Sequence, residues 1–203
     1  DGISLIQVAE GALNETHSIL QRMNELATQA ANDTNTSTDR TAIQAEIDQL
    51  QSEINRIQST TQFNTMNLLD GSFSEKNLQI GALSGQKISV SIGKMNTACL
   101  GIDSLKMSSF SAAGKAMEAI QAAIDKVSTQ RSTLGALQNR LEHTINNLDT
   151  TSENTQSAES RIRDTDMASE MVEYSKNNIL SQAGQSMLAQ ANQQTQGVLS
   201  LIG

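Results

Sequence analysis

The sequence predicts a mainly α-helical fold, an elongated rod-like bundle of long antiparallel helices with a small β-hairpin and a separate C-terminal helix. Apolar residues recur every three or four positions over long stretches, which is the period of one helix face. The 203 residues include no proline, so no proline interrupts a long helix. Aromatic residues make up only 2% of the chain, so the core must use aliphatic side chains, methionine and alanine.

Two antiparallel helices are predicted at the start of the chain, over residues 3–31 and 37–61. The stretch NDTNTSTDR separates them, and its residues favour turns and caps, with Ser37 as the predicted N-cap. The link is short, so the second helix should fold back along the first. Thr16 interrupts the first apolar stripe. The two stripes are Ile6, Ala9, Leu13, Leu20, Met23, Ala27 and Ala30, and then Ile43, Ile47, Leu50, Ile54 and Ile57.

A β-hairpin is predicted over residues 78–92, because apolar and polar residues alternate on both sides of the Ser84-Gly85 turn. A lone hairpin is marginally stable in water, so it should lie against the helices. Residues 93–109 follow no period and are expected to form a surface connection. They include Cys99, the only cysteine, so the chain can form no internal disulfide.

A long third helix is predicted over residues 111–150. Roughly 37 residues of helix span about 55 Å, whereas a compact globule of this chain length is about 43 Å across. The architecture is therefore expected to be a rod. The stretch TSENTQSAESRIRDTDM is interpreted as a polar joint. We accordingly divide the chain into a rod-like core, residues 1–160, and a joint with a C-terminal helix, residues 161–203.

The last 27 residues, from Asn177 onward, contain no charged side chain. Apolar residues gather on one side of a helical wheel and amides on the other, which predicts an amphipathic helix. Amides avoid the repulsion of like charges on crowded identical subunits, so we expect this helix to pack against copies of itself. A flexible low-complexity tail is the alternative. The stripe comprises Leu180, Ala183, Met187, Leu188, Ala191, Val198 and Leu201.

Composition and motifs argue against several other functions. The net charge is −8 and no basic stripe occurs, so we expect no nucleic-acid partner. No apolar run reaches the ~18 residues of a membrane span, and no secretory leader opens the chain. His17 and His143 lack metal-ligand spacing, and no nucleophile, base and orienting residue form a set. We therefore predict no enzyme, no cofactor, no metal site and no membrane partner.

Five long motifs resemble bacterial flagellin: DGISLIQVAEGALNETHSILQRMNEL, TQFNTMNLLDGSF, LGALQNRLEHTINNL, AESRIRDTDMASEM and NNILSQAGQSMLAQANQQ. They are collinear over nearly the whole chain. The resemblance implies a structural subunit of the flagellar filament, with the C-terminal helix paired to an N-terminal helix in an inner tube. That N-terminal helix and the variable outer domains are missing here, so we expect this stretch alone not to polymerise.

The resemblance also implies partners and a location. The subunit self-assembles into a hollow motility fibre. Its partners are further copies of itself, a flagellar secretion chaperone bound to the C-terminal stripe, and the filament cap and hook-junction proteins. It is secreted to the extracellular flagellum by the flagellar type III system without a cleaved signal peptide.

The same resemblance implies recognition by host Toll-like receptor 5. We expect Leu26 to be partly exposed, opposite the apolar stripe of the first helix, with Arg22 as an anchor. Asn24 and Leu50 stand where the family's most recognisable form has basic residues, which leaves the strength of signalling open. The matching receptor positions are Gln21, Arg22, Leu26, Gln29, Ile43 and Glu46.

Two alternative functions remain open. A hook–filament junction protein shares the terminal helices, although TQFNTMNLLDGSF and the predicted hairpin favour flagellin. A chemoreceptor-type signalling coiled coil needs two nearly symmetrical heptad arms and no β-hairpin. The alternation between Leu78 and Ile92 argues against it.

Overall fold

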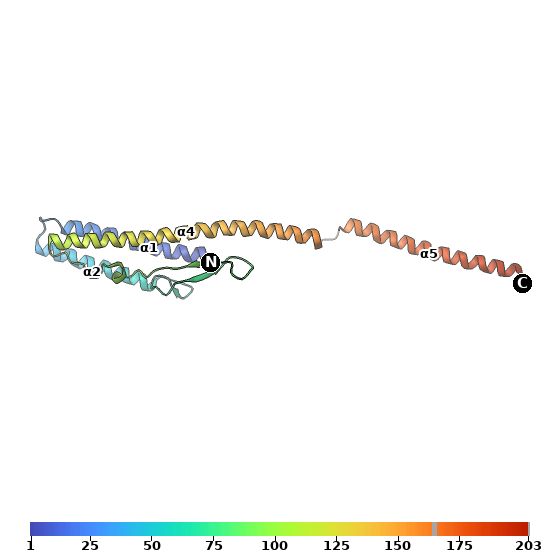
Figure 1. The fold of residues 1–203 in the computed structure, drawn as a ribbon, viewed down its shortest axis with the longest axis horizontal. Helices are drawn as coiled ribbons and strands as arrows, with labels where there is room; N and C mark the ends of the chain where they lie inside the picture. The colour runs from blue at the N-terminus through green and yellow to red at the C-terminus, as the bar shows by residue number, and fades with distance from the viewer. Residues whose placement is uncertain (164–165, 203) are drawn as a thin grey trace. The chain divides into compact units, whose positions relative to one another are not determined.

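The computed structural model describes residues 1–163 and 166–202, and at residues 195–196 and 198–202 it describes the backbone only. The chain divides between Leu148 and Asp149 into two compact units. Unit 1 is a helical bundle that carries short strands, and the described part of unit 2 is helical (Figure 1). The prediction of a mainly α-helical fold with long helices and a small β-hairpin is confirmed.

The first two helices of unit 1 form an antiparallel pair. α1 (Gly2–Ala30) and α2 (Ser37–Thr60) pack side by side, joined by a short turn (Figure 1). Thr36 caps α2 in a capping box with Asp39, one residue before the predicted cap at Ser37. The turn and the cap together fix the direction in which α2 returns along α1.

The third long helix, α4 (Phe110–Arg163), lies along this pair within unit 1 (Figure 1). It runs antiparallel to α1, because later positions of α1 meet earlier positions of α4. Gly2 lies beside Leu141, and Glu10 forms an ion pair with Arg131 at 3.6 Å. The apolar stripes of the three helices meet in one core. Its fully buried side chains include Ile6, Leu13, Leu20, Ile47, Ile54, Ile120, Val127 and Leu134.

Two small antiparallel hairpins follow α2 in the chain. The strands are β1 (Gln62–Phe63), β2 (Met66–Asn67), β3 (Lys76–Gln79) and β4 (Lys87–Val90). In the second hairpin Leu78 lies opposite Ile88. Ile88 and Val90 are buried in the core, so the hairpin lies against the helices.

The expected surface connection at residues 93–109 is wrong. This segment, here called the strap, contains the short helix α3 (Thr97–Leu100) and sends apolar side chains into the core. An irregular segment can be buried only when its backbone polar groups find partners. The buried apolar residues of the strap are Met95, Leu100, Ile102, Leu105 and Met107.

Three amide side chains on one face of α2 supply those partners, and we call them the amide clamp. They are Gln44, Gln51 and Asn55. Gln44 donates from Nε2 to the carbonyl oxygen of Leu105 at 3.1 Å and accepts from the backbone N–H of Met107 at 2.9 Å. Asn55 accepts from the backbone N–H of Thr97 at 3.1 Å. The clamp therefore holds the strap through its main chain.

Unit 2 begins inside α4, which continues to Arg163 through most of the predicted polar joint. The helix predicted to end near residue 150 is therefore longer than expected, and residues 149–163 include no glycine or proline that would end it. The last helix, α5 (Met167–Ile202), follows. The Asp166 carboxylate accepts a hydrogen bond from the backbone N–H of Ala168 at 3.0 Å and so caps α5.

Candidate functional site

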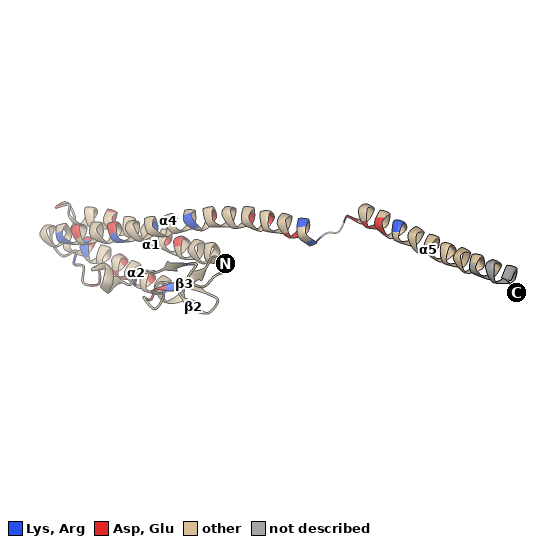
Figure 2. Ribbon diagram, turned by 45° about the vertical axis from the view of Figure 1, so that its right-hand side comes forward, with Lys and Arg blue, Asp and Glu red and all other residues tan. Residues whose placement is uncertain are grey.

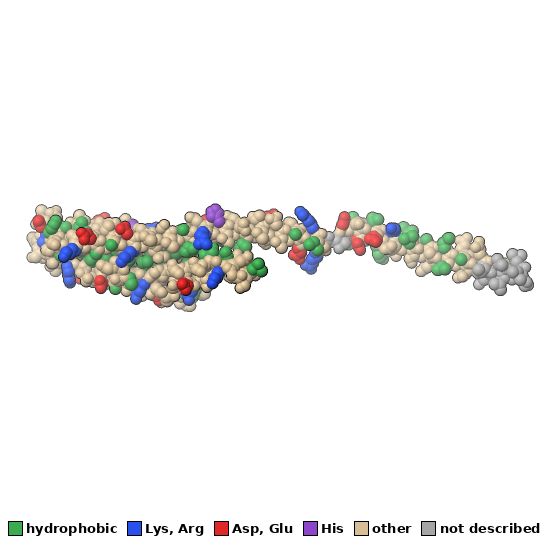
Figure 3. Space-filling model, viewed as in Figure 1, with side chains coloured by type: hydrophobic (Ala, Val, Ile, Leu, Met, Phe, Trp, Pro, Cys, Tyr) green, Lys and Arg blue, Asp and Glu red, His purple; other side chains and the backbone are tan. Residues whose placement is uncertain are grey.

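The C-terminal helix α5 exposes an apolar surface. None of its described side chains is buried, and Met187 is 70% exposed. Figure 3 shows apolar side chains along the described part of α5. Large contiguous apolar patches on soluble proteins mark interaction sites. The predicted assembly residues Leu180, Ala183, Met187, Leu188 and Ala191 are all exposed, and the side chains of Val198 and Leu201 lie outside the described residues.

Charge on α5 is confined to its first three turns (Figure 2). Glu170, Glu173 and Lys176 lie there, and the sequence carries no charge from Asn177 onward. The polar side chains that accompany the apolar stripe between Leu180 and Ala191 are therefore amides and hydroxyls. Such a helix suits contact with identical neighbours better than permanent exposure to water.

A second candidate surface crosses α1 and α2. Arg22 donates from Nη2 to Oε1 of Glu46 at 2.9 Å and from Nη1 to Oε2 of Glu25 at 3.2 Å. These bonds, first to Glu46 and then to Glu25, raise the pKa of the Arg22 guanidinium. The structure thus brings together two predicted receptor residues from different helices. Sequence reasoning does not single out Glu25, although its three-residue spacing from Arg22 signals an ion pair.

The expected partial exposure of Leu26 is wrong. Leu26 is 2% exposed and Ile43 is 7% exposed, and both belong to the core of unit 1. The helical-wheel argument misses this because α2 packs on the side of α1 that Leu26 faces, which widens the buried arc. Gln21 and Gln29 are exposed as expected. The accessible part of this surface is therefore polar, with apolar residues underneath.

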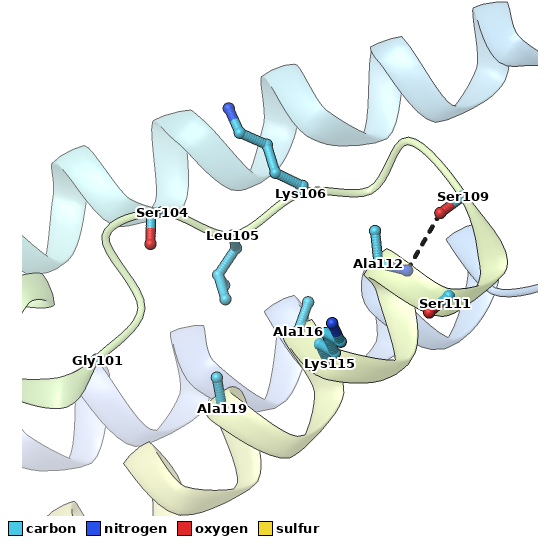
Figure 4. Close-up of a pocket in the computed structure, with 10 residues that line it drawn as sticks. All are labelled: Gly101, Ser104, Leu105, Lys106, Ser109, Ser111, Ala112, Lys115, Ala116 and Ala119. Carbon is cyan, nitrogen blue, oxygen red and sulfur yellow. Dashed lines mark hydrogen bonds between the residues drawn. The ribbon is translucent and has the colours of Figure 1, made fainter.

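A groove of about 460 Å³ lies between the strap and the first turns of α4 (Figure 4). Leu105 points from the strap toward α4, and Lys106 points the other way. The hydroxyl oxygen of Ser109 accepts a hydrogen bond from the backbone N–H of Ala112 at 3.2 Å and caps α4. The lining residues include hydroxyl groups but no His, Asp or Glu that could act as a base. We assign the groove no catalytic role.

Metal and membrane sites receive no support from the described residues. Within them, no three His, Cys, Asp or Glu side chains lie close enough together to hold a metal ion. No helix in the same part of the chain combines the length and the apolar content of a membrane span. The thiol of Cys99 is free and exposed on α3.

Comparison with known proteins places the chain in a family. Residues 1–74 match the bacterial flagellin N-terminal helical region, and residues 117–202 match the bacterial flagellin C-terminal helical region. A flagellin of Halalkalibacterium halodurans is 54% identical over 204 residues, which cover 100% of this chain and 75% of that protein. The chain belongs to the bacterial flagellin family.

Other flagellins and filament proteins give the same result. A flagellin of Bacillus subtilis is 51% identical over 237 residues, covering 100% of this chain and 78% of its own. The flagellar filament 31.3 kDa core protein of Treponema maltophilum is 47% identical over 218 residues, covering 100% of this chain and 76% of that protein. The crystal structure of Bacillus cereus flagellin matches 78% of this chain and 92% of its own, with 32% identity and a TM-score of 0.65.

Family membership settles the coarse function. Flagellins are structural proteins that polymerise into the extracellular flagellar filament, and they form no enzyme family. The chain is accordingly a filament subunit, and the relatives named above are flagellins or filament core proteins. Residues 75–116, which include β3, β4 and the strap, lie between the two matched regions.

Proposed function

We propose that this filament subunit assembles through α5, whose apolar stripe packs against the equivalent helices of neighbouring copies around a shared interior. The exposure of that stripe carries the proposal, with Leu180 at 58% and Met187 at 70%. Burial of one large apolar side chain contributes about 1.5–3 kcal/mol. A stripe of several such residues is therefore sufficient to drive association.

The polar side of α5 supports the same proposal. Residues after Lys176 carry amides and hydroxyls in place of the Lys and Glu residues that ordinary surface helices use. In a crowded array of identical helices, like charges would repel one another and would lose their hydration. Amides form hydrogen bonds there without either cost.

The test is filament formation in a cell. The complete gene that contains this sequence, with all of its flanking coding sequence, is expressed in a Bacillus subtilis strain without its own flagellin, as wild type and as Leu180→Asp. The aspartate places an unpaired carboxylate in the packed stripe, so we expect electron microscopy to show no filaments. Immunoblots of the medium measure the exported amount of each protein, and filament yield is compared per exported subunit, so weaker chaperone binding is not mistaken for a loss of assembly.

Phe110→Asp is the matched control. Phe110 is 63% exposed at the start of α4, so this change adds the same charge at an exposed apolar residue outside α5. We expect its filaments to match the wild type. Normal filaments from Leu180→Asp would refute the proposal, whereas loss of filaments from both variants would show a general effect of added charge.

We also propose that host Toll-like receptor 5 binds the surface that crosses α1 and α2. Arg22 and Glu46 form its centre, since their ion pair joins the two helices at an accessible position. Gln21 and Gln29 are exposed on α1, on either side of Arg22 in the sequence. Leu26 and Ile43 act from below, where their burial fixes the spacing of the two helices.

Receptor binding is measured by surface plasmon resonance with the purified receptor ectodomain and monomeric chain. Arg22→Ala removes the central cation and should weaken binding by about 10-fold or more, as expected for an interface anchor. Arg56→Ala is the matched control, because Arg56 forms an exposed ion pair with Glu53 on α2. Equal effects of the two variants would contradict the placement of the receptor surface.

Three further partners and the export route are proposed from the family resemblance. A flagellar secretion chaperone covers the α5 stripe before assembly, and the filament cap and hook-junction proteins contact the subunit. Export proceeds through the flagellar type III system without a cleaved signal peptide. The exposed stripe supports the chaperone site, and Leu180→Asp should reduce co-purification of the chaperone. Unchanged co-purification would place the chaperone elsewhere.

A further inference from the structure

The eight methionines of the chain are unevenly protected. Met23 and Met107 are fully buried in unit 1, and Met95 is 8% exposed. Met187, in contrast, is 70% exposed on α5, where Met167 and Met171 are also open to solvent. An exposed thioether is open to oxidation, whereas a buried one is shielded. The reactive methionines are thus concentrated on the helix that we propose as the assembly element.

Met187 occupies a special position among them. On a helical wheel it lies between Ala183 and Ala191 and close to Leu180, so it is central to the apolar stripe. Met171 is 16 residues earlier and lies about 160° away around the helix at about 100° per residue. Two methionines of similar exposure, at 70% and 59%, therefore lie on opposite faces of α5.

We propose that Met187 is an oxidation site that controls whether a subunit can enter the filament. In the unassembled chain a hydroperoxide transfers its terminal oxygen to the thioether sulfur. The peroxide O–O bond breaks, a sulfur–oxygen bond forms, and the sulfur loses two electrons. The peroxide is reduced to water, or to an alcohol if it is organic, and no atom leaves the side chain. The proposal rests on the assembly role of α5.

The oxidised side chain is unsuited to the packed stripe. A sulfoxide carries a polar oxygen that needs a hydrogen-bond donor, and the neighbouring stripe residues are Leu and Ala. Burial of that oxygen without a donor weakens each contact between copies. In the assembled filament the same sulfur is covered by neighbouring helices and resists oxidation. The site therefore rejects oxidised subunits before assembly and leaves assembled ones untouched.

The experiment compares oxidised and untreated subunits. Filaments from the complemented Bacillus subtilis strain are dissociated to monomers by heat, treated with hydrogen peroxide, freed of oxidant and offered to filament seeds. Mass spectrometry locates the sulfoxides, and sedimentation measures the polymer. We expect oxidised wild type to give about 10-fold less polymer, in line with loss of a hydrogen-bond partner on burial.

Four variants assign the effect. Met187→Leu should polymerise equally well before and after peroxide, because leucine keeps the volume and lacks the sulfur. Met171→Leu, on the opposite face, and Met66→Leu, 41% exposed in unit 1, should remain peroxide-sensitive. Met187→Gln places a permanent polar group at the site and should polymerise poorly without any oxidant.

The outcomes separate this inference from the assembly proposal. If untreated Leu180→Asp monomers add to seeds as well as untreated wild-type monomers do, the assembly role of α5 is refuted. If untreated monomers add and the oxidised ones add equally well, the oxidation site is refuted while the assembly role stands. Rescue by Met171→Leu in place of Met187→Leu also refutes the assignment to Met187.

Discussion

The helices α1 and α5 carry similar apolar patterns but meet opposite surroundings. In α1 the stripe from Leu5 to Ala30 provides ten buried residues. In α5 a stripe of the same spacing, from Leu180 to Ala191, is exposed at every described position. The spacing of apolar residues thus predicts that a helix has a partner, but it does not say whether that partner belongs to the same chain.

The other side chains of the two helices distinguish the cases. The outer face of α1 carries Glu15, Arg22 and Glu25, which suit contact with water. The α5 helix lacks charge after Lys176. A charged outer face therefore accompanies the helix whose partners lie within the chain, and the uncharged face of α5 fits the proposed packing against further subunits.

Replacing a leucine by alanine in the α1 stripe and in the α5 stripe should give the largest difference in the free energy of unfolding. Leu20→Ala leaves a cavity in the core of unit 1, where Leu20 is fully buried. We expect the free energy of unfolding to fall by about 2–5 kcal/mol, measured by urea titration with circular dichroism. Leu188→Ala, 67% exposed on α5, should change it by less than about 0.5 kcal/mol. Equal losses would mean that α5 is packed within the monomer.

A substitution in the amide clamp measures how much its hydrogen bonds to the strap contribute to the stability of unit 1. Gln44→Ala removes both hydrogen bonds to the strap and leaves the carbonyl of Leu105 and the N–H of Met107 without their partner. The expected loss is about 1–3 kcal/mol, with faster hydrogen exchange at Met107. Gln138→Ala is the control, because the Gln138 side chain donates a hydrogen bond to Glu142 on its own helix, at 3.0 Å. A strap that exchanges normally in Gln44→Ala would show that apolar burial alone holds it.

Removing the N-cap of α2 should give the smallest loss of stability among the changes in unit 1. Thr36→Ala removes the hydroxyl that accepts from the backbone N–H of Asp39, at a cost of about 1 kcal/mol. Thr41→Ala is the control, since Thr41 also carries an exposed hydroxyl on α2. Thermal unfolding measures both, and an equal fall in Tm for the two variants would argue against the cap.

The same cap also has a predicted pH dependence. Hydrogen bonds from the hydroxyl and then the backbone N–H of Thr36 lower the pKa of Asp39 in the folded chain. Stability from these bonds is complete above the pKa of Asp39 in the unfolded chain and is lost as the pH falls through its lower folded pKa. The acid sensitivity of Tm should therefore be weaker in Thr36→Ala than in the wild type.

The sequence predicts the helices and the hairpin well because their periods are regular. Even Thr16, the interruption in the α1 stripe, keeps its place in the core, because its hydroxyl donates to the carbonyl oxygen of Ala12 at 3.0 Å. The strap has no period to detect. Its burial depends on Gln44, Gln51 and Asn55. These residues are seven and four positions apart, which places them on one face of α2. That spacing is the signal that sequence reasoning could have used.

The candidate surfaces are predicted unequally for a related reason. The α5 stripe is readable because composition and period agree along one helix. Arg22 and Glu46 are 24 positions apart, and the sequence alone cannot show that they meet. Leu26 was misplaced because a helical wheel does not show how far a neighbouring helix extends the buried arc. Residues that depend on two elements thus need the structure.

The main-chain character of the amide clamp has an evolutionary consequence. Gln44 and Gln51 bind carbonyl and N–H groups of the strap, which every residue except proline supplies in full. Outward-facing strap positions such as Cys99 and Asp103 are therefore free to drift in sequence while the strap keeps its path. The strap can therefore change its outer surface without any change in the bundle beneath it.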